Sequence, residues 1–517
     1  MNFLETSNIG ALPRGSGAFA DVSIWLEEAI FGHRLWYRQT PWLVFLEFLG
    51  VADAFARKGA LFAPTTPEET TPYDLRFRST LRNVLFNNDA LPRIAAQRRD
   101  DPSRWAEWTE EMLKAGAGPA GCLDELQRRF ARFDDFAELV ALVRQTTIEP
   151  GSNRRWSSRF VFPFGVGALF SDATLQMKRD YTVFGRTGEL LYLMLTRSSY
   201  TDRLRQHFEV FLDPDQAKNR LVALLGSAAD DTPDLSMKGE MFLPYRKHPA
   251  FDRLAVDWLA ILDIGLPDQD GFAHLVPLAT LHVMLYQLET AAAVAGVPRP
   301  NIVCEMIAPK RELVRQRSIA SYYANDALSR QAIAAYQAEH VAERMPQEHD
   351  AEIESGEALD DARDFLRRSF SYAPKEEHFD SIEDLLAKFE QTAETKLDAN
   401  CGLVHSSFGR YIGLISRRGT NRNRYAPTDA LLKTLVIARV AKRLEFGKFL
   451  SDMYVQYGFV FGPVEAKLAL DPDSFDEATF ERNKERLEAR LSSMGMLKRL
   501  SDGCAYVLNP FSLAAES

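Results

Sequence analysis

Apolar residues recur at the three- and four-residue spacing of helices along most of the chain. This pattern gathers apolar side chains on one face and therefore predicts amphipathic helices. The clearest predicted helices outside the C-terminal quarter cover residues 40–55, 101–112, 187–195, 271–295 and 381–397. Two of them follow a polar capping residue and a proline, a usual helix start, and Thr187 is expected to cap a third.

The C-terminal quarter has the most regular pattern. Helices are predicted from Thr428 to about residue 444, over 446–457, over 464–470 and over 480–494. Two short apolar runs on either side of Asp502-Gly503 then predict a β-hairpin, because Asp-Gly favours a tight hairpin turn. Helices followed by a hairpin are typical of a winged helix. The predicted fold class is therefore mainly α and multi-domain, with a small β component in a C-terminal winged helix.

A length of 517 residues predicts about three or four domains. Nine Asp or Glu against two Arg between residues 343 and 364 indicate a solvated acidic linker. The expected segments are an N-terminal helical domain (1–148), a central helical domain (149–342), the acidic linker (343–365), a helical segment with a basic loop (366–425) and the winged-helix domain (426–517).

Charge and cysteine content limit the class of protein. The net charge is −10 and 46% of residues are hydrophobic, which excludes a polycation and a disordered chain. The four cysteines are far apart, without a Cys-x-x-Cys pair, as is usual for reduced thiols. The first residues do not resemble a signal peptide, and the apolar stretch at 42–52 is too short to span a bilayer. We expect a soluble cytoplasmic protein without membrane contact.

Any contact with nucleic acid must come from a local basic patch. The stretch from Cys401 to Tyr425 contains five arginines and no acidic residue, and its Gly and Asn residues favour turns. Such a loop can bind the phosphate backbone of duplex DNA. The predicted phosphate-binding residues are Arg417, Arg418, Arg422 and Arg424, with a second, weaker cluster at Arg154, Arg155 and Arg159.

The predicted winged helix is itself nearly neutral. Residues 426–517 contain twelve Lys or Arg and thirteen Asp or Glu, and the candidate recognition helix has four of each sign. A helix that reads DNA usually carries a positive excess. Docking to protein is therefore at least as good an interpretation of this domain as reading DNA.

Signatures of catalysis are absent from the sequence. It contains no Gly-Lys-Ser/Thr phosphate loop, no His-Glu-x-x-His and no Gly-x-Ser-x-Gly. Glu465-Ala466-Lys467 matches half of a nuclease motif, and His274, His282 and Glu289 share helical spacing, but both patterns are commoner in ordinary helices. We expect no catalytic residues, no metal and no cofactor.

Two stretches resemble a known group of proteins. They are Phe184-Gly185-Arg186-Thr187-Gly188-Glu189-Leu190-Leu191-Tyr192 and the passage from Arg417-Arg418-Gly419-Thr420 into the winged helix. They are similar to accessory proteins of bacterial anti-phage defence systems, either methylation-associated or phosphorothioation-dependent and DptG-like. The resemblance implies antiviral defence, a multi-subunit complex and nearby DNA, and it transfers no functional residues.

The favoured function is a non-catalytic accessory subunit of an antiviral defence complex associated with restriction and modification. Its expected partners are ATPase, methylase or nuclease subunits, with duplex DNA as a further partner. One alternative is a winged-helix transcriptional regulator. The other is a metal-dependent nuclease whose active site is assembled from distant acidic residues.

Overall fold

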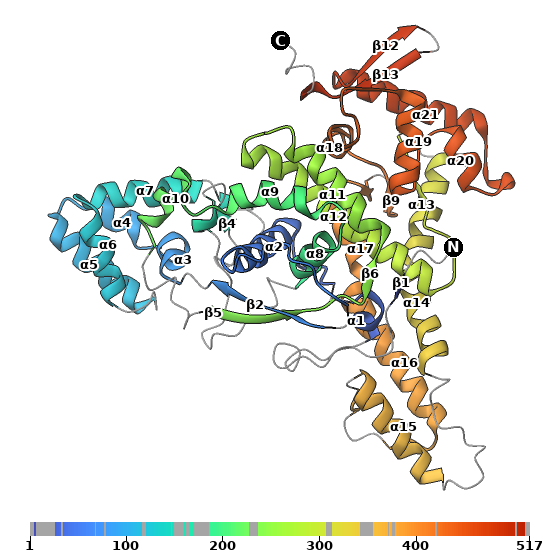
Figure 1. The fold of residues 1–517 in the computed structure, drawn as a ribbon, viewed down its shortest axis with the longest axis horizontal. Coiled ribbons are helices and arrows are strands. Elements are labelled where there is room, and N and C mark those ends of the chain that lie inside the picture. The colour runs from blue at the N-terminus through green and yellow to red at the C-terminus, as the bar shows by residue number, and fades with distance from the viewer. Residues whose placement is uncertain are drawn as a thin grey trace.

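The structure is a computed structural model, shown in Figure 1. It describes residues 5–6, 26–32, 35–67, 69–76, 79–115, 120–145, 147–148, 160–161, 165–168, 186–226, 236–306, 313–341, 355–370, 372–374, 378–418, 421–501 and 504–511. The protein is mainly helical, as the sequence predicts, and its strands are short.

A large body forms the centre of the molecule (Figure 1). Its helices are α1 (Leu26–Phe31), α2 (Pro41–Ala56), α8 (Thr187–Thr196), α9 (Thr201–Leu212), α11 (Pro249–Leu262), α12 (Asp268–Val294), α13 (Leu313–Asp326), α14 (Leu328–Tyr336), α15 (Ser355–Phe370), α16 (Ile382–Ala399) and α17 (Val404–Tyr411). Its two-stranded sheets pair β1 (Glu5–Thr6) with β6 (Tyr245–Lys247), β2 (Thr71–Arg76) with β5 (Ser236–Met241), and β8 (Ile415–Ser416) with β9 (Arg424–Tyr425); a further two-stranded sheet pairs β3 (Thr147–Ile148) with β4 (Phe160–Val161).

Aromatic side chains fill the core where α2, α8, α9 and α11 meet. Phe48 on α2 has its ring centroid 5.2 Å from that of Trp258 and 5.4 Å from that of Phe208, both edge-on. Tyr192 stacks on Phe62 at 5.2 Å and its hydroxyl accepts the Phe62 backbone N–H. Edge-on and stacked pairs of this kind add to the free energy of burying the rings.

A buried carboxylate completes the start of α8. Glu47 on α2 accepts hydrogen bonds from the backbone N–H groups of Arg186 and Gly188, at 3.2 and 2.7 Å. Negative charge is favourable there because unpaired N–H groups point out of a helix start. A Cβ at Gly188 would lie 2.6 Å from Glu47 Cβ, so only glycine fits. The prediction that Thr187 caps α8 is wrong: Arg186, at φ 69°, holds that position and α2 supplies the acceptor.

A separate helical lobe extends from one side of the body (Figure 1). Its helices are α3 (Ser79–Phe86), α4 (Leu91–Ala95), α5 (Asp101–Lys114), α6 (Ala120–Arg129) and α7 (Phe133–Gln145), with α10 (Ala217–Ala223) against them. Trp105, Trp108 and Phe136 form the centre of its own hydrophobic core. The Trp108 indole N–H is buried and donates to Asn88 Oδ1 at 2.9 Å.

The C-terminal unit is formed by residues 429–511. Its elements are α18 (Asp429–Arg439), β10 (Arg443–Glu445), α19 (Phe446–Tyr457), β11 (Phe459–Val460), α20 (Pro463–Ala469), α21 (Glu477–Ser493), β12 (Leu497–Ser501) and β13 (Cys504–Leu508). The central strand of its antiparallel sheet is β13, in the order β10-β13-β12. The predicted start of α18 at Thr428 is confirmed, since the Thr428 hydroxyl accepts the Leu431 N–H.

Buried charges join the C-terminal unit to the body. Asp257 on α11 accepts hydrogen bonds from the Tyr457 hydroxyl at 2.5 Å and from Arg439 at 3.0 Å, and lies 2.7 Å from His282 Nε2. The strand β7 (Ile302–Val303) also pairs in parallel with β11 of the C-terminal unit. Because buried ionic groups are costly unless they are paired, these contacts fix how the two parts meet.

Among the residues that the structure describes, one helix, α12, is long and apolar enough to cross a membrane. The structure instead buries 83% of its most apolar window inside the protein, as the sequence predicts for residues 271–295. Cys122, Cys304, Cys401 and Cys504 are free thiols.

The hydrophobic cores divide the chain differently from the segments expected from sequence. Within 1–148, the first helices and β2 contribute to the main core, whereas only residues 81–143 build the lobe. The expected acidic linker runs into helix α15, whose Ala358 and Ala362 are buried in the main core. Residues of the expected domains 149–342, 366–425 and 426–517 share that main core as well.

The buried histidine that starts α11 predicts a pH dependence of folding. Burial lowers the pKa of His248 to about 3, and its Nδ1 accepts the Ala250 N–H. Below about pH 6.5 the unfolded chain takes up a proton at this residue and the folded chain does not. The free energy of unfolding therefore decreases as the pH is lowered. Between pH 7 and 5, urea unfolding should show a loss about 2 kcal/mol larger for the wild type than for His248→Asn, which keeps a capping acceptor. Equal losses would contradict a neutral, buried His248.

Candidate nucleic-acid interface

The predicted arginine loop is a short β-hairpin between α17 and α18. Strands β8 and β9 pair antiparallel, with Ser416 opposite Arg424. Gly413 ends α17 at a φ of 76°, and an added Cβ there would lie 2.3 Å from the Thr428 hydroxyl oxygen. The Thr428 N–H also donates to the Gly413 carbonyl. The turn before the hairpin and the start of α18 are therefore held together.

Three of the predicted phosphate-binding residues lie exposed on this hairpin. Arg417 and Arg418 follow β8 directly, and both side chains are exposed. The Arg417 Nε–H lies 3.4 Å from the Asn421 carbonyl, and Asn421 adopts a φ of 56° that turns the chain back. Arg422 is also exposed on the returning side. The hairpin thus presents three guanidinium groups to solvent within six residues.

The fourth predicted residue, Arg424, faces the interior and contradicts its predicted role. Its side chain is only 7% exposed and pairs with the carboxylate of Glu305. Arg315 on α13 binds the same carboxylate at 2.6 Å, and the Glu305 N–H donates to the Tyr425 carbonyl at 2.8 Å. Arg424 is therefore occupied inside the protein and we remove it from the phosphate-binding set.

A buried polar network fixes the other side of the hairpin base. The two ring nitrogens of His405 lie 2.8 Å from the Tyr425 hydroxyl and 3.1 Å from Asp326 Oδ1. Asn325 donates to the Tyr425 hydroxyl at 2.9 Å. A Tyr–His–Asp series can move protons, but burial raises the pKa of Tyr425 well above its usual value, so the phenol stays protonated. The network serves to position the hairpin.

The second predicted cluster, Arg154, Arg155 and Arg159, lies outside the described residues. Its prediction stays untested by the structure.

Internal ion pairs involve much of the charge on α21. Lys484 pairs with Glu481 at 2.8 Å and Arg490 with Asp429 at 2.5 Å. Glu488 accepts from Arg499 on β12 at 3.0 Å. These pairs leave little excess positive charge on the candidate recognition helix. The hairpin is the stronger candidate for contact with phosphates.

The residues considered for metal chemistry do not come together. His274 contacts the Thr434 hydroxyl, His282 contacts Asp257, and Glu289 pairs with Arg253 and Arg299. Within the described ranges, no group of three His, Cys, Asp or Glu side chains could hold a metal ion.

The half-motif Glu465-Ala466-Lys467 lies on α20. Glu465 is 3% exposed, and burial raises the pKa of its carboxyl group. A buried carboxyl group of raised pKa is a poor ligand for Mg²⁺, which prefers ionised, hydrated oxygen ligands.

Comparison with known proteins gives no family for this chain. No protein-family model matches it, and neither a curated protein nor a solved structure does so.

The sequence predicted a basic, turn-like loop here but missed both its pairing into a hairpin and Glu305, the residue that decides which arginine is exposed. A signal for it exists: Glu305 is the one charged residue in the apolar run Ile302-Val303-Cys304-Glu305-Met306. A carboxylate inside such a run implies a buried cationic partner. Which arginine that is depends on the tertiary fold.

Replacing the buried Arg424 should lower the free energy of unfolding more than replacing the exposed Arg418. Arg424→Ala removes a buried charged hydrogen bond and should cost about 2 kcal/mol of unfolding free energy. Arg418→Ala changes an exposed side chain and should change it by less than about 0.5 kcal/mol. Urea denaturation of both variants measures the difference. If Arg424→Ala unfolds like the wild type, the Glu305 pair is not what anchors the hairpin.

Proposed function

We propose that this protein is an accessory subunit that holds the phosphate backbone of duplex DNA on the β8–β9 hairpin and docks other proteins. The observation that carries the proposal is that the hairpin combines buried anchoring residues with exposed arginines. Arg424 and Tyr425 are anchored in the core, whereas Arg417, Arg418 and Arg422 are exposed. Because the two ends of the hairpin are held rigidly by the core, its exposed arginines lose less conformational entropy when they bind phosphates.

The number of exposed arginines favours a subunit of a larger complex over a free-standing DNA-binding protein. Three phosphate contacts alone give weak binding that salt weakens further, and the net charge of −10 opposes approach to DNA. Partners that contribute their own DNA contacts raise the effective concentration of each site for the duplex. The hairpin is suited to positioning DNA that other subunits also hold.

We place this complex in bacterial antiviral defence, in the cytoplasm, with ATPase, methylase or nuclease subunits as partners. The support is the resemblance carried by residues 184–192 and 417–420. In the first stretch, Arg186, Gly188 and Glu189 build the buried start of α8. That stretch therefore contributes stability, whereas the exposed arginines of the hairpin are the residues available for contact with DNA.

We also propose a winged-helix fold for the C-terminal unit. Support comes from its chain order of helix, strand, helices and hairpin, and from its sheet order β10-β13-β12. The internal pairing of charges on α21 favours a unit that docks protein over one that reads bases.

The DNA contact is testable through its salt dependence. Arg417→Ala/Arg418→Ala should reduce the slope of log K against log salt by about two, since each phosphate contact contributes about 0.9. The measurement is fluorescence anisotropy of a labelled duplex of about 20 base pairs at several salt concentrations.

A matched variant controls for the loss of two positive charges. Arg98→Ala/Arg220→Ala removes two exposed arginines far along the chain from the hairpin and should leave the slope at the wild-type value. Equal slopes for all three proteins, or no binding of the folded wild type at low salt, would contradict the proposal.

A further inference from the structure

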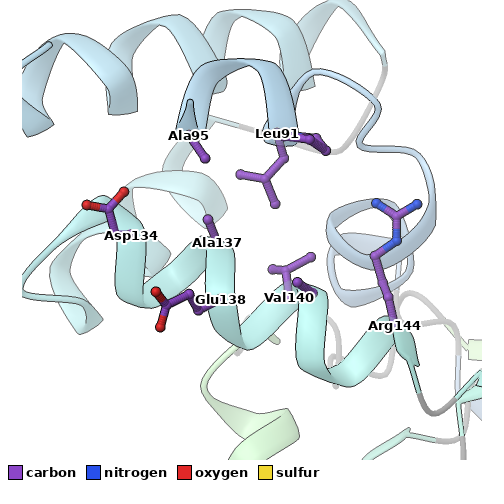
Figure 2. Close-up of a pocket in the computed structure, with 9 residues that line it drawn as sticks. Leu91, Ala95, Asp134, Ala137, Glu138, Val140 and Arg144 are labelled. Atoms are coloured by element: carbon purple, nitrogen blue, oxygen red, sulfur yellow. The ribbon is translucent and has the colours of Figure 1, made fainter. Parts of the chain in front are cut away.

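An open groove lies on the surface of the helical lobe, between α4 and α7 (Figure 2). It has a volume of about 320 Å³. Its apolar lining consists of Leu91, Pro92, Ala95, Ala137, Val140 and Ala141. Leu91 and Val140 are buried core residues of the lobe, so the floor of the groove is rigid.

The wall formed by α7 has the shape of a helix-packing surface. Asp134, Ala137, Glu138, Ala141 and Arg144 follow one another at intervals of three, one, three and three residues, which places them along one side of α7. Asp134 and Arg144 are ten positions apart on α7, which corresponds to about 15 Å, or nearly three turns. The short alanine side chains let the backbone of a second helix approach closely.

The charged residues of the groove lie at its ends. Figure 2 shows Asp134 and Glu138 at one end and Arg144 at the other. Asp134 is bound by Arg104 at 2.6 Å, while Glu138 is exposed. An occupant therefore meets the exposed carboxylate of Glu138 at one end and the half-buried Arg144 at the other, with apolar surface between.

This distribution suits a protein segment better than a small metabolite. Sites for small polar ligands place a few polar groups inside the cavity to fix the orientation of the ligand. The middle of this groove is lined by alanine, leucine, valine and proline. An amphipathic helix fits both the apolar middle and the charged ends of the groove, because it carries apolar side chains along one face and can carry charges at its ends.

We propose that the α4–α7 groove docks an amphipathic helix of a partner protein. The docked helix carries large apolar side chains at i, i+4 and i+7, with a basic residue at the end that faces Glu138. This inference deepens the proposed function, on which it depends for the existence of a protein partner. Because the lobe has its own core, docking leaves the body and the hairpin unchanged.

The test is selection of a displayed library of random 16-residue peptides on the full-length protein. Enriched peptides should share the apolar spacing and carry Lys or Arg toward one end. Their affinities are then measured by anisotropy on the wild type and on three variants. If no enriched peptide depends on the groove, or if the dependent peptides lack helical spacing, the proposal is overturned.

The variants separate the groove from the rest of the lobe. Ala141→Trp fills the groove from an exposed position and should weaken binding at least tenfold. Ala106→Trp makes the same change at an exposed position on α5 outside the groove and should leave binding unchanged. Glu138→Lys should weaken the basic peptides about fivefold, the ratio expected for one exposed pair of opposite charges. Equal binding to Ala141→Trp and Ala106→Trp would contradict the proposal.

Failure of this inference is distinguishable from failure of DNA binding. Ala141→Trp should bind the labelled duplex with the wild-type salt slope, and Arg417→Ala/Arg418→Ala should bind the selected peptides with wild-type affinity. If either variant lost both duplex binding and peptide binding, the two sites would not be independent. That result would overturn the proposal that the lobe docks a helix without involving the rest of the protein.

Discussion

A buried carboxylate must be paired with a cation or strong hydrogen-bond donors. This requirement determines how the β8–β9 hairpin and the C-terminal unit pack against the body. Asp257 binds Arg439 and Tyr457 of the C-terminal unit, and Glu305 binds Arg424 of the hairpin. Each carboxylate belongs to the body and its partner to a later part of the chain. Removing Arg424 or Arg439 takes away part of the pairing of a buried carboxylate, so these contacts favour one arrangement of the body, the hairpin and the C-terminal unit.

Local signals in the sequence predicted most helices because their start and stop residues act within a few positions. Thr428 and Ser381 cap their helices through their own hydroxyl groups, and Gly458 ends α19 at a φ of 73°. The apolar pattern also predicted α12 as a buried helix. The start of α8 could not be predicted, since its acceptor, Glu47, lies about 140 residues earlier in the chain.

The candidate site was predictable as a segment but not residue by residue. Arg418 and Arg424 are alike in sequence, each within a run of Arg, Gly and Asn, yet one is exposed and the other buried. Strand alternation and the position of Glu305 decide between them, and both are tertiary properties. The groove between α4 and α7 carries no sequence signal because its alanines and end charges resemble any solvated helix face.

The central claim is that duplex DNA lies on the exposed arginines of the anchored hairpin. Hydrogen–deuterium exchange of the full-length protein, with and without a duplex of about 20 base pairs at low salt, tests it most directly. The account predicts slower exchange in peptides covering residues 414–426 and unchanged exchange in the lobe at 79–145. Unchanged exchange in the hairpin while DNA is bound elsewhere would contradict it.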